Sequence, residues 1–298
     1  VISSHALAGE VMVPGDKSIT HRAILMASMA KGESCIRHPL ISGVTMTMLI
    51  AVQQLGISWK LDEDVLIIKS PGLKAFTPPN QPLDCKNSAT TMRLLAGCLS
   101  ASGIPVVLDG SESLRKRPMN RVVDPLQRMG VRIESCNEGK APLKLSERPL
   151  WQTLRGLFFE SPVASAQVKS CILLAGLAAD DPVIYTEPVL SRDHTELMLK
   201  SMGIKIESVS REEGDTVILQ PGGMEYLHPL NLKIPGDFSA AAFLMVAALI
   251  TPGSNIILKG VGLNPTRIGL MVVLQEMEAD IQILETWVES GELVGNVR

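Results

Sequence analysis

The chain comprises 298 residues with a net charge of −3 and a pI near 6.0, a mildly acidic balance that argues against general nucleic-acid binding. Its longest uninterrupted apolar run, residues 240–250, is too short to span a bilayer. Aromatic residues make up only 3% of the chain against 46% apolar residues overall, so Ala, Val, Ile, Leu and Met must fill the core.

The cysteines and histidines favour neither disulfides nor a metal centre. The five Cys form no C-x-x-C pair, and no two of the five His have metal-ligand spacing on one helix face. The first ten residues lack both the basic and the apolar region of a signal peptide. We therefore expect reduced thiols, a cytoplasmic location and no bound metal.

Four stretches along the chain begin as helices rich in Ala, Leu and Met. Each has a Ser near its start, where a hydroxyl can satisfy a free backbone N–H, so four N-caps are expected: Ser18, Ser88, Ser165 and Ser239. The first stretch, "PGDKSITHRA" (14–23), contains G-D-K-S but lacks the glycines of a P-loop. A nucleotide site of that type is not expected.

A second series of helices alternates with the first and ends on a repeated pattern. Four equivalent positions, spaced 74, 73 and 75 residues apart, anchor it: Leu55, Met129, Met202 and Met277. In three copies the residue after the anchor is a Gly (Gly56, Gly130 and Gly203), which suits the left-handed backbone that often follows a helix. In the fourth copy it is Glu278, which suits that conformation less well. The chain is therefore predicted to be a repeat of α/β units, each running strand, helix, strands, helix, strand.

A longer period indicates the domains. Residues 11–34 parallel residues 232–255 at an offset of 221, which is three units. We therefore expect a complete three-unit domain at 14–227, and a partial second domain made of 1–13 plus 228–298. Two further units of that second domain are expected to lie outside this chain.

Cationic side chains gather at the unit starts and on one loop, where helix N-termini add partial positive charge: Lys17, Arg22, Arg93, residues 114–121, Lys169 and Arg192. Their recurrence at equivalent places predicts a cleft for a small, multiply anionic ligand.

Two other patterns could indicate catalytic residues, but a structural explanation or the spacing argues against each. Asp193 and His194 are better explained as a helix cap and a surface His than as a catalytic dyad, and "SAQVK" (165–169) has one residue too many for S-x-x-K.

Six motifs, in order along the chain, resemble one known family. They are "PGDKSITHRA", "LDCKNSATTMRLLAG", "LRKRPMNRVVDPL", "ASAQVKSCILLAGL", "SRDHTE" and "NPTR". Together they look like the 5-enolpyruvylshikimate-3-phosphate synthases, which are enolpyruvyl transferases and the target of the herbicide glyphosate. The resemblance implies a two-domain fold with three α/β units in each domain. It also implies transfer of the enolpyruvyl group of phosphoenolpyruvate to the 5-hydroxyl of shikimate 3-phosphate, with release of phosphate and with no metal or organic cofactor.

The resemblance also implies roles for particular residues. Lys17 would lie between the two anionic substrates and act in catalysis. A second group would hold shikimate 3-phosphate: Ser18, Arg22, Ser165, Gln167, Ser191 and Arg192. Arg117 would bind phosphoenolpyruvate, with Ala89 and Thr90 beside it. Ala89 stands where most glyphosate-sensitive members have Gly, so a glyphosate-insensitive site is expected.

Several departures from the family pattern leave alternatives open. The family's acid/base Asp and Glu match no residue of this chain, Lys86 stands in place of a usual Gly, and Val44 stands in place of a common Asp. A non-catalytic fragment that binds shikimate 3-phosphate, or that pairs with a complementary C-terminal chain, is one alternative. A UDP-N-acetylglucosamine enolpyruvyl transferase is disfavoured, because residues 109–121 lack its reactive Cys.

Overall fold

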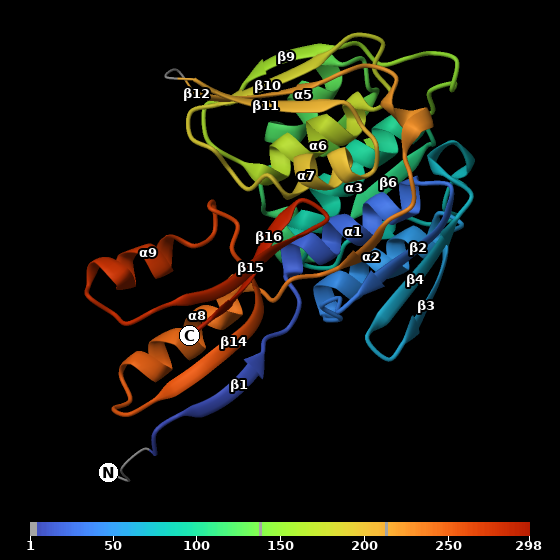
Figure 1. The fold of residues 1–298 in the computed structure, drawn as a ribbon. Coiled ribbons are helices and arrows are strands. Elements are labelled where there is room, and N and C mark those ends of the chain that lie inside the picture. Colours follow the sequence, from blue (N-terminus) through green and yellow to red (C-terminus); the bar gives the residue numbers. More distant parts are fainter. Residues whose placement is uncertain (1–4, 137–138, 212–213) are drawn as a thin grey trace.

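A computed structural model describes residues 5–136, 139–211 and 214–298. These residues form four α/β units, each with a four-stranded sheet on its outer side (Figure 1). In every sheet one edge strand is parallel to its neighbour, and the remaining pairs are antiparallel. The repeat in the sequence is thus a repeat in topology, and the α/β fold class is confirmed.

The first three units share a single hydrophobic core. The first contains α1 (Lys17–Met29), β2 (Gly32–Arg37), α2 (Gly43–Gln54), β3 (Ser58–Asp62) and β4 (Val65–Ser70), followed by a 3₁₀ turn at Leu73–Ala75. The second contains β5 (Leu83–Asp84), α3 (Ala89–Ser102), β6 (Val106–Asp109), α4 (Glu112–Arg115), α5 (Asn120–Arg128), β7 (Ile133–Cys136) and β8 (Lys140–Leu145). The third contains β9 (Leu157–Glu160), α6 (Ala166–Gly176), β10 (Val183–Glu187), α7 (His194–Ser201), β11 (Ile206–Arg211) and β12 (Gly214–Leu219), followed by a 3₁₀ turn at Gly223–Tyr226.

The fourth unit lies to one side of these three and has a smaller core of its own (Figure 1). It contains α8 (Phe238–Leu249), β14 (Asn255–Gly262), α9 (Gly269–Glu276), β15 (Ile283–Glu289) and β16 (Glu292–Val297). In each unit a single strand follows the first helix and a hairpin follows the second, so the predicted order of strands within the unit was wrong. The hairpin closes at a tight turn that periodicity alone does not reveal, such as the one at Glu63 with φ of 53°.

Two short strands are exchanged between the first and fourth units. β1 (Ala8–Met12) precedes α1 in the chain but pairs with β14 of the fourth unit. β13 (Asn231–Lys233) precedes α8 but pairs with β2 of the first unit. The division at residue 228 stays a prediction, but this pairing places residues 231–233 with the first unit.

The repeat anchors end the second helix of every unit. Leu55, Met129, Met202 and Met277 are the C-cap residues of α2, α5, α7 and α9. The glycines that follow have φ near 90°, and Glu278 takes the same left-handed backbone with φ of 64°. The expected misfit of the fourth copy is therefore accommodated as local strain, because a side chain disfavours that conformation.

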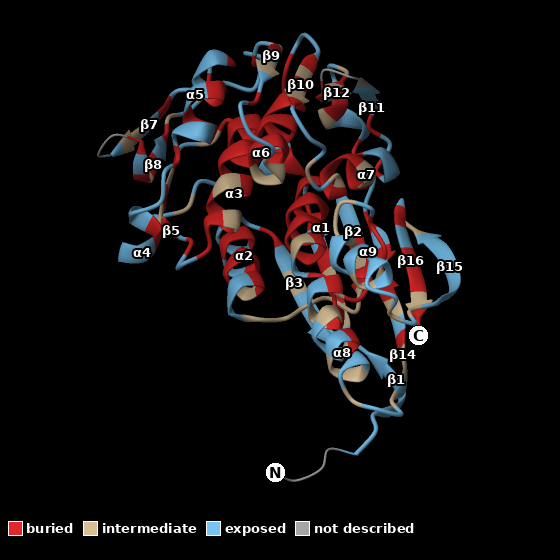
Figure 2. Ribbon diagram, turned by 90° about the vertical axis from the view of Figure 1, so that its left-hand side faces the viewer, coloured by how far each residue is buried: buried red, intermediate tan, exposed pale blue. Residues whose placement is uncertain are grey.

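The first helices of the three units form the centre of the large core. Most of α1, α3 and α6 is buried (Figure 2), which agrees with their apolar residues on every side. α3 and α6 pack at Gly97, where an added Cβ would lie 2.2 Å from the carbonyl oxygen of Cys171. Only Gly permits that approach, which brings the two helix N-termini together.

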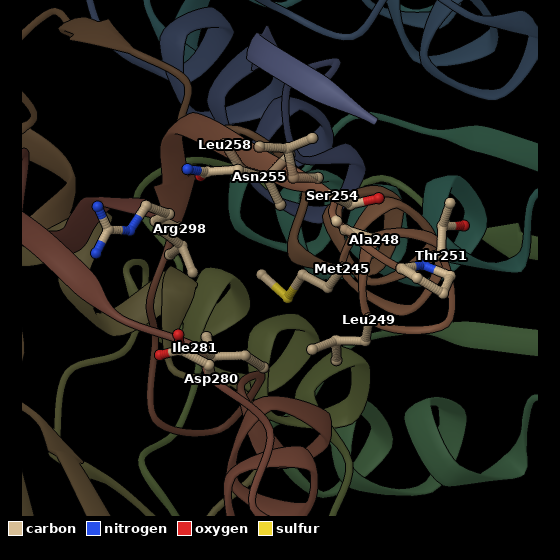
Figure 3. A pocket seen from close by; sticks show the side chains of 14 residues that line it. Met245, Ala248, Leu249, Thr251, Ser254, Asn255, Leu258, Asp280, Ile281 and Arg298 are labelled. Carbon is tan, nitrogen blue, oxygen red and sulfur yellow. The ribbon is translucent and has the colours of Figure 1, made fainter. Parts of the chain in front are cut away.

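The corresponding helix of the fourth unit is much more exposed. α8 is apolar on every side, yet Phe243 is 80% exposed and buried positions are few. Between α8, β14 and the loop at Ile281 lies a cavity of about 440 Å³ lined by Met245, Leu249 and Arg298 (Figure 3). All of the predicted substrate-binding residues lie elsewhere, on the first three units.

Candidate active site

Three helix N-termini meet at one place in the large core. The side-chain amide of Gln167, the second residue of α6, donates to Thr90 Oγ1, in the second position of α3, at 2.9 Å. Arg22 of α1 donates to the carbonyl oxygens of Ser18 and Ala166 at 3.0 and 3.4 Å, which ties α1 to α6. None of these helices has an acidic residue in its first turn. The cap Asp16 offsets part of the N-terminal charge of α1, whereas α3 is capped by the neutral Ser88. With Arg93 and Arg192 beside the three helix starts, the junction favours an anion.

The predicted serine caps are right in two units and wrong in two. The hydroxyls of Ser88 and Ser165 accept from backbone N–H groups at the starts of α3 and α6. In α1 and α8 the cap is instead the Asp of the repeated P-G-D, since Asp16 and Asp237 accept those bonds. A carboxylate two residues earlier offers the same acceptor and adds charge at the helix N-terminus.

Ser18 is consequently available to another partner. Its hydroxyl accepts from the Arg192 guanidinium at 3.3 Å, which joins α1 to the segment before α7. Arg192 is largely exposed, and burial of part of its side chain, followed by the charge of Arg267, lowers its pKa. Arg192 therefore presents a cation beside the helix junction.

An open cavity of about 460 Å³ lies against this junction. Its walls are the start of α6 and the segment before α7, with one residue each from α3 and from the fourth unit: Arg93, Ala164, Ser165, Ala166, Gln167, Leu190, Ser191, Arg192 and Thr266. Two arginines, two hydroxyl side chains of Ser and an amide thus converge on one space. Four of the residues assigned to shikimate 3-phosphate from the sequence line this cavity.

Arg22 is placed differently from what the sequence suggested. It is 3% exposed, and four of its five N–H groups donate to Ser18, Ala166, Ser170 and Thr195. Burial, opposed by the nearby Glu196 and Asp16 carboxylates, lowers its pKa to about 10. Arg22 mainly links α1, α6 and α7, and its predicted contact with substrate stays a prediction.

Lys169 does not belong to the anion-binding surface. Its ammonium group is fully buried and lies 2.8 Å from Glu187 and 2.7 Å from Glu196. Burial opposes the charge, but the two carboxylates outweigh it and raise the pKa of Lys169. The sequence could not show this, because all three residues come from different elements of the third unit.

A second group of cations lies beside the start of α3. Ala89 is its first residue and is 4% exposed, whereas Arg117 is exposed in the loop after α4. The pKa of Arg93 is lowered by burial and then by the charges of Arg121 and Arg117, so the three guanidinium groups lie near one another. Arg93 donates to the Gln167 side chain at 2.5 Å and so connects this group to the cavity.

Comparison with known proteins decides the family. The model of the EPSP synthase (3-phosphoshikimate 1-carboxyvinyltransferase) family matches residues 1–295. The chain belongs to the EPSP synthase family. The 3-phosphoshikimate 1-carboxyvinyltransferases of Staphylococcus aureus strains MRSA252 and Newman are each 44% identical over 280 residues, which are 94% of this chain and 63% of theirs. The chain thus spans less than two thirds of the length of these relatives.

Solved EPSP synthases have the same fold. A structure of EPSP synthase from Acinetobacter baumannii has a TM-score of 0.91 at 37% identity, covering all of this chain and 65% of that one. A second structure of the enzyme from that organism has a TM-score of 0.90 and covers 98% of this chain. The recognition made from the six motifs and the expected enolpyruvyl-transferase fold are both confirmed.

Two of the departures from the family pattern, at Lys86 and Val44, have local explanations. Lys86 has φ of 50°, a left-handed conformation that Gly adopts more easily, and its ammonium pairs with Asp84 at 2.6 Å. Val44 is the second residue of α2, where Ser42 and Thr45 already bond at the helix start. Neither change disturbs the site-forming ends of α1, α3 and α6.

Contacts between the first three units and the fourth involve an arginine and two carboxylates to which the sequence alone gave no role. Arg267 of the "NPTR" motif donates to Asp16 at 3.2 Å and to Asp237 at 2.9 Å, and so joins the caps of α1 and α8. Lys17, the first residue of α1, is exposed beside this group, and its backbone N–H donates to Asp237 at 3.3 Å. The repeated P-G-D was the signal that could have pointed to this junction.

The "SRDHTE" motif also bonds across the units. Asp193 accepts from Asn264 at 2.6 Å, and His194 bonds with Glu292 of β16 at 2.6 Å. His194 is 1% exposed, so the expectation of a surface His was wrong. Its ring partner is Glu292 and not Asp193, which leaves no Asp193–His194 dyad.

Within the residues that the structure describes, neither a membrane-spanning helix nor a metal-binding cluster is found. No helix within 5–136, 139–211 and 214–298 is long and apolar enough to cross a membrane. In the same part of the chain, no cluster of three or more His, Cys, Asp or Glu side chains has the geometry to bind a metal ion.

Proposed function

We propose that the protein to which this chain belongs transfers the enolpyruvyl group of phosphoenolpyruvate to the 5-hydroxyl of shikimate 3-phosphate and releases phosphate. The observation that carries the proposal is the junction of three helix N-termini beside a cavity with Arg93 and Arg192 in its wall. Both substrates are anions, and such a junction stabilises negative charge. Family membership supplies the reaction, and a cytoplasmic location is part of the same proposal.

The cavity is the proposed site of shikimate 3-phosphate. Arg192 and the first turn of α6, with Ser165 and Gln167, hold the phosphate and ring hydroxyls. Ser18, which already bonds to Arg192, completes one side. Ser191 lines the same cavity, whereas Arg22 is buried and donates to the carbonyl oxygens of Ser18 and Ala166.

Phosphoenolpyruvate is proposed to bind at the start of α3, between Arg117 and the backbone of Ala89 and Thr90. Lys17 lies at the junction of the first and fourth units and offsets the charge of both substrates. Fixed cations directed at developing charge are a major source of catalysis, and losing one such group costs roughly 100- to 1,000-fold in kcat.

Calorimetric titration with shikimate 3-phosphate tests the proposal. Arg192→Ala and Lys17→Ala should each weaken binding about tenfold, since a hydrogen bond to a charged group contributes about 1.5–3 kcal/mol. Arg132→Ala, which removes an exposed arginine just before β7, is the matched control and should bind normally. Unchanged affinity in both site variants would contradict the assignment of the cavity.

A second candidate function is a substrate-binding chain that a complementary chain completes. Exposed apolar side chains on α8 and at its C-cap, including Phe243 and Ile250, favour this candidate. A phosphate-release assay distinguishes the two functions: binding with steady turnover supports the enzyme, whereas binding without turnover supports the fragment. Titration with UDP-N-acetylglucosamine should show no binding in either case.

A further inference from the structure

Both walls of the proposed shikimate 3-phosphate cavity are attached to one buried carboxylate. Glu187, the last residue of β10, is 1% exposed. Its Oε1 accepts from the backbone N–H and the hydroxyl of Ser191, both at 2.8 Å. Its Oε2 accepts from the backbone N–H of Ser165 at 3.3 Å. Ser165 begins one wall of the cavity and Ser191 belongs to the other.

The charge of this carboxylate is balanced from the side away from the cavity. Lys169 donates to Glu187 Oε1 at 2.8 Å and also to the carbonyl oxygen of Ser191 at 3.2 Å. The same ammonium pairs with Glu196, which lies near Arg22. Two cations and two carboxylates therefore form a charge-balanced buried group, which adds no net repulsion toward an anionic ligand.

The contacts also restrict what Ser191 can do. Its hydroxyl hydrogen is used in the bond to Glu187, so its oxygen is left only as an acceptor. A phosphate oxygen needs a donor. In this arrangement Ser191 fixes the backbone next to Arg192 and does not supply a hydrogen bond to phosphate.

We propose that Glu187 is a positioning residue that holds the segment 190–192 and the start of α6 at the separation that shikimate 3-phosphate requires. Its action on the ligand passes through Ser165, Ser191 and the adjoining Arg192. The inference rests on the proposed function, because it assigns the ligand of the cavity to shikimate 3-phosphate.

The test is calorimetric titration of the full chain with shikimate 3-phosphate. Glu187→Gln removes the charge and replaces one acceptor with a donor, and we expect affinity to fall about tenfold. Glu187→Asp keeps a carboxylate near Lys169, so the buried charges stay balanced, but its side chain is shorter by about 1.5 Å. It should bind several-fold more weakly because it cannot hold both walls.

Combining Glu187→Gln with Ser191→Ala distinguishes a positioning role from general destabilisation of the fold. Ser191→Ala should weaken binding in the wild-type chain but add almost nothing in the Glu187→Gln background, because both changes break the same connection. Thr186→Val is the matched control. Thr186 precedes Glu187 on β10, and the change removes the hydrogen bond between the Thr186 and Thr216 hydroxyls without altering either wall. It should bind normally.

The outcomes are distinct. Wild-type affinity in Glu187→Asp, additive losses in the double variant, or an equal loss in Thr186→Val would overturn the positioning role. Absence of binding by the wild-type chain would instead contradict the proposed function of the cavity.

Discussion

Replacing Gly97 with Ala should separate the two helices on which the site depends. The new Cβ would lie 2.2 Å from the Cys171 carbonyl oxygen and 2.8 Å from its carbonyl carbon and Cα. Ordinary contact begins at about 3.4 Å, so α3 and α6 must move apart by about 1.2 Å. The obstructing atoms belong to the backbone, so no side-chain rotation relieves the clash.

The expected cost follows from two opposing effects. Overpacking a core costs about 1–3 kcal/mol, and a backbone clash belongs at the upper end. Ala recovers up to about 1 kcal/mol through its higher helix propensity. We therefore expect the free energy of unfolding to fall by about 2 kcal/mol. The Thr90–Gln167 bond across the same interface should weaken, and with it the affinity for shikimate 3-phosphate.

Urea denaturation of Gly97→Ala measures the change, with binding followed by calorimetry. Gly43→Ala is the matched control, because Gly43 begins α2 and an added Cβ there meets nothing within 4 Å. The control should be neutral or slightly stabilised. Equal stability of the two variants would refute the argument that close approach of α3 and α6 requires Gly97.

Three further predictions concern the unit junction, pH and inhibition. Arg267→Ala removes the partner of the Asp16 and Asp237 carboxylates and should lower the free energy of unfolding, measured by urea denaturation, by about 3 kcal/mol. A decrease below about 1 kcal/mol, the value expected for the exposed pair of Lys74 with Glu225, would contradict this prediction. Burial, only partly opposed by the bond to the Lys17 carbonyl oxygen, lowers the pKa of His21 below 6.5. The unfolded chain then binds more protons below pH 6.5, so stability should fall as pH falls from 6.5 toward the folded pKa, and His21→Gln should flatten that slope. Ala89→Gly should increase inhibition by glyphosate about tenfold in protein that turns over, because removing the methyl group at the start of α3 widens a tight site; unchanged inhibition would show that this methyl group does not limit the inhibitor.

The sequence by itself determined the features that depend on local backbone preferences and on periodicity. The 74-residue repeat, the left-handed glycines after Leu55, Met129 and Met202, and the Ser caps of α3 and α6 depend on neighbouring residues only. The motifs that carry the family resemblance are likewise continuous segments. Each of these could be inferred without knowing what packs against it.

The tertiary structure decided which charged residues are free to meet a ligand. The sequence shows three equivalent cations in Arg22, Lys169 and Arg192, yet of these only Arg192 is exposed at the cavity. Arg22 is instead bonded to Thr195 and Ser170. Lys169 is enclosed by the carboxylates of Glu187 and Glu196. The exchange of β1 and β13 and the role of Glu187 also needed the structure. These features join residues that lie far apart in the chain, and no local preference encodes which distant partner neutralises a buried charge or completes a sheet.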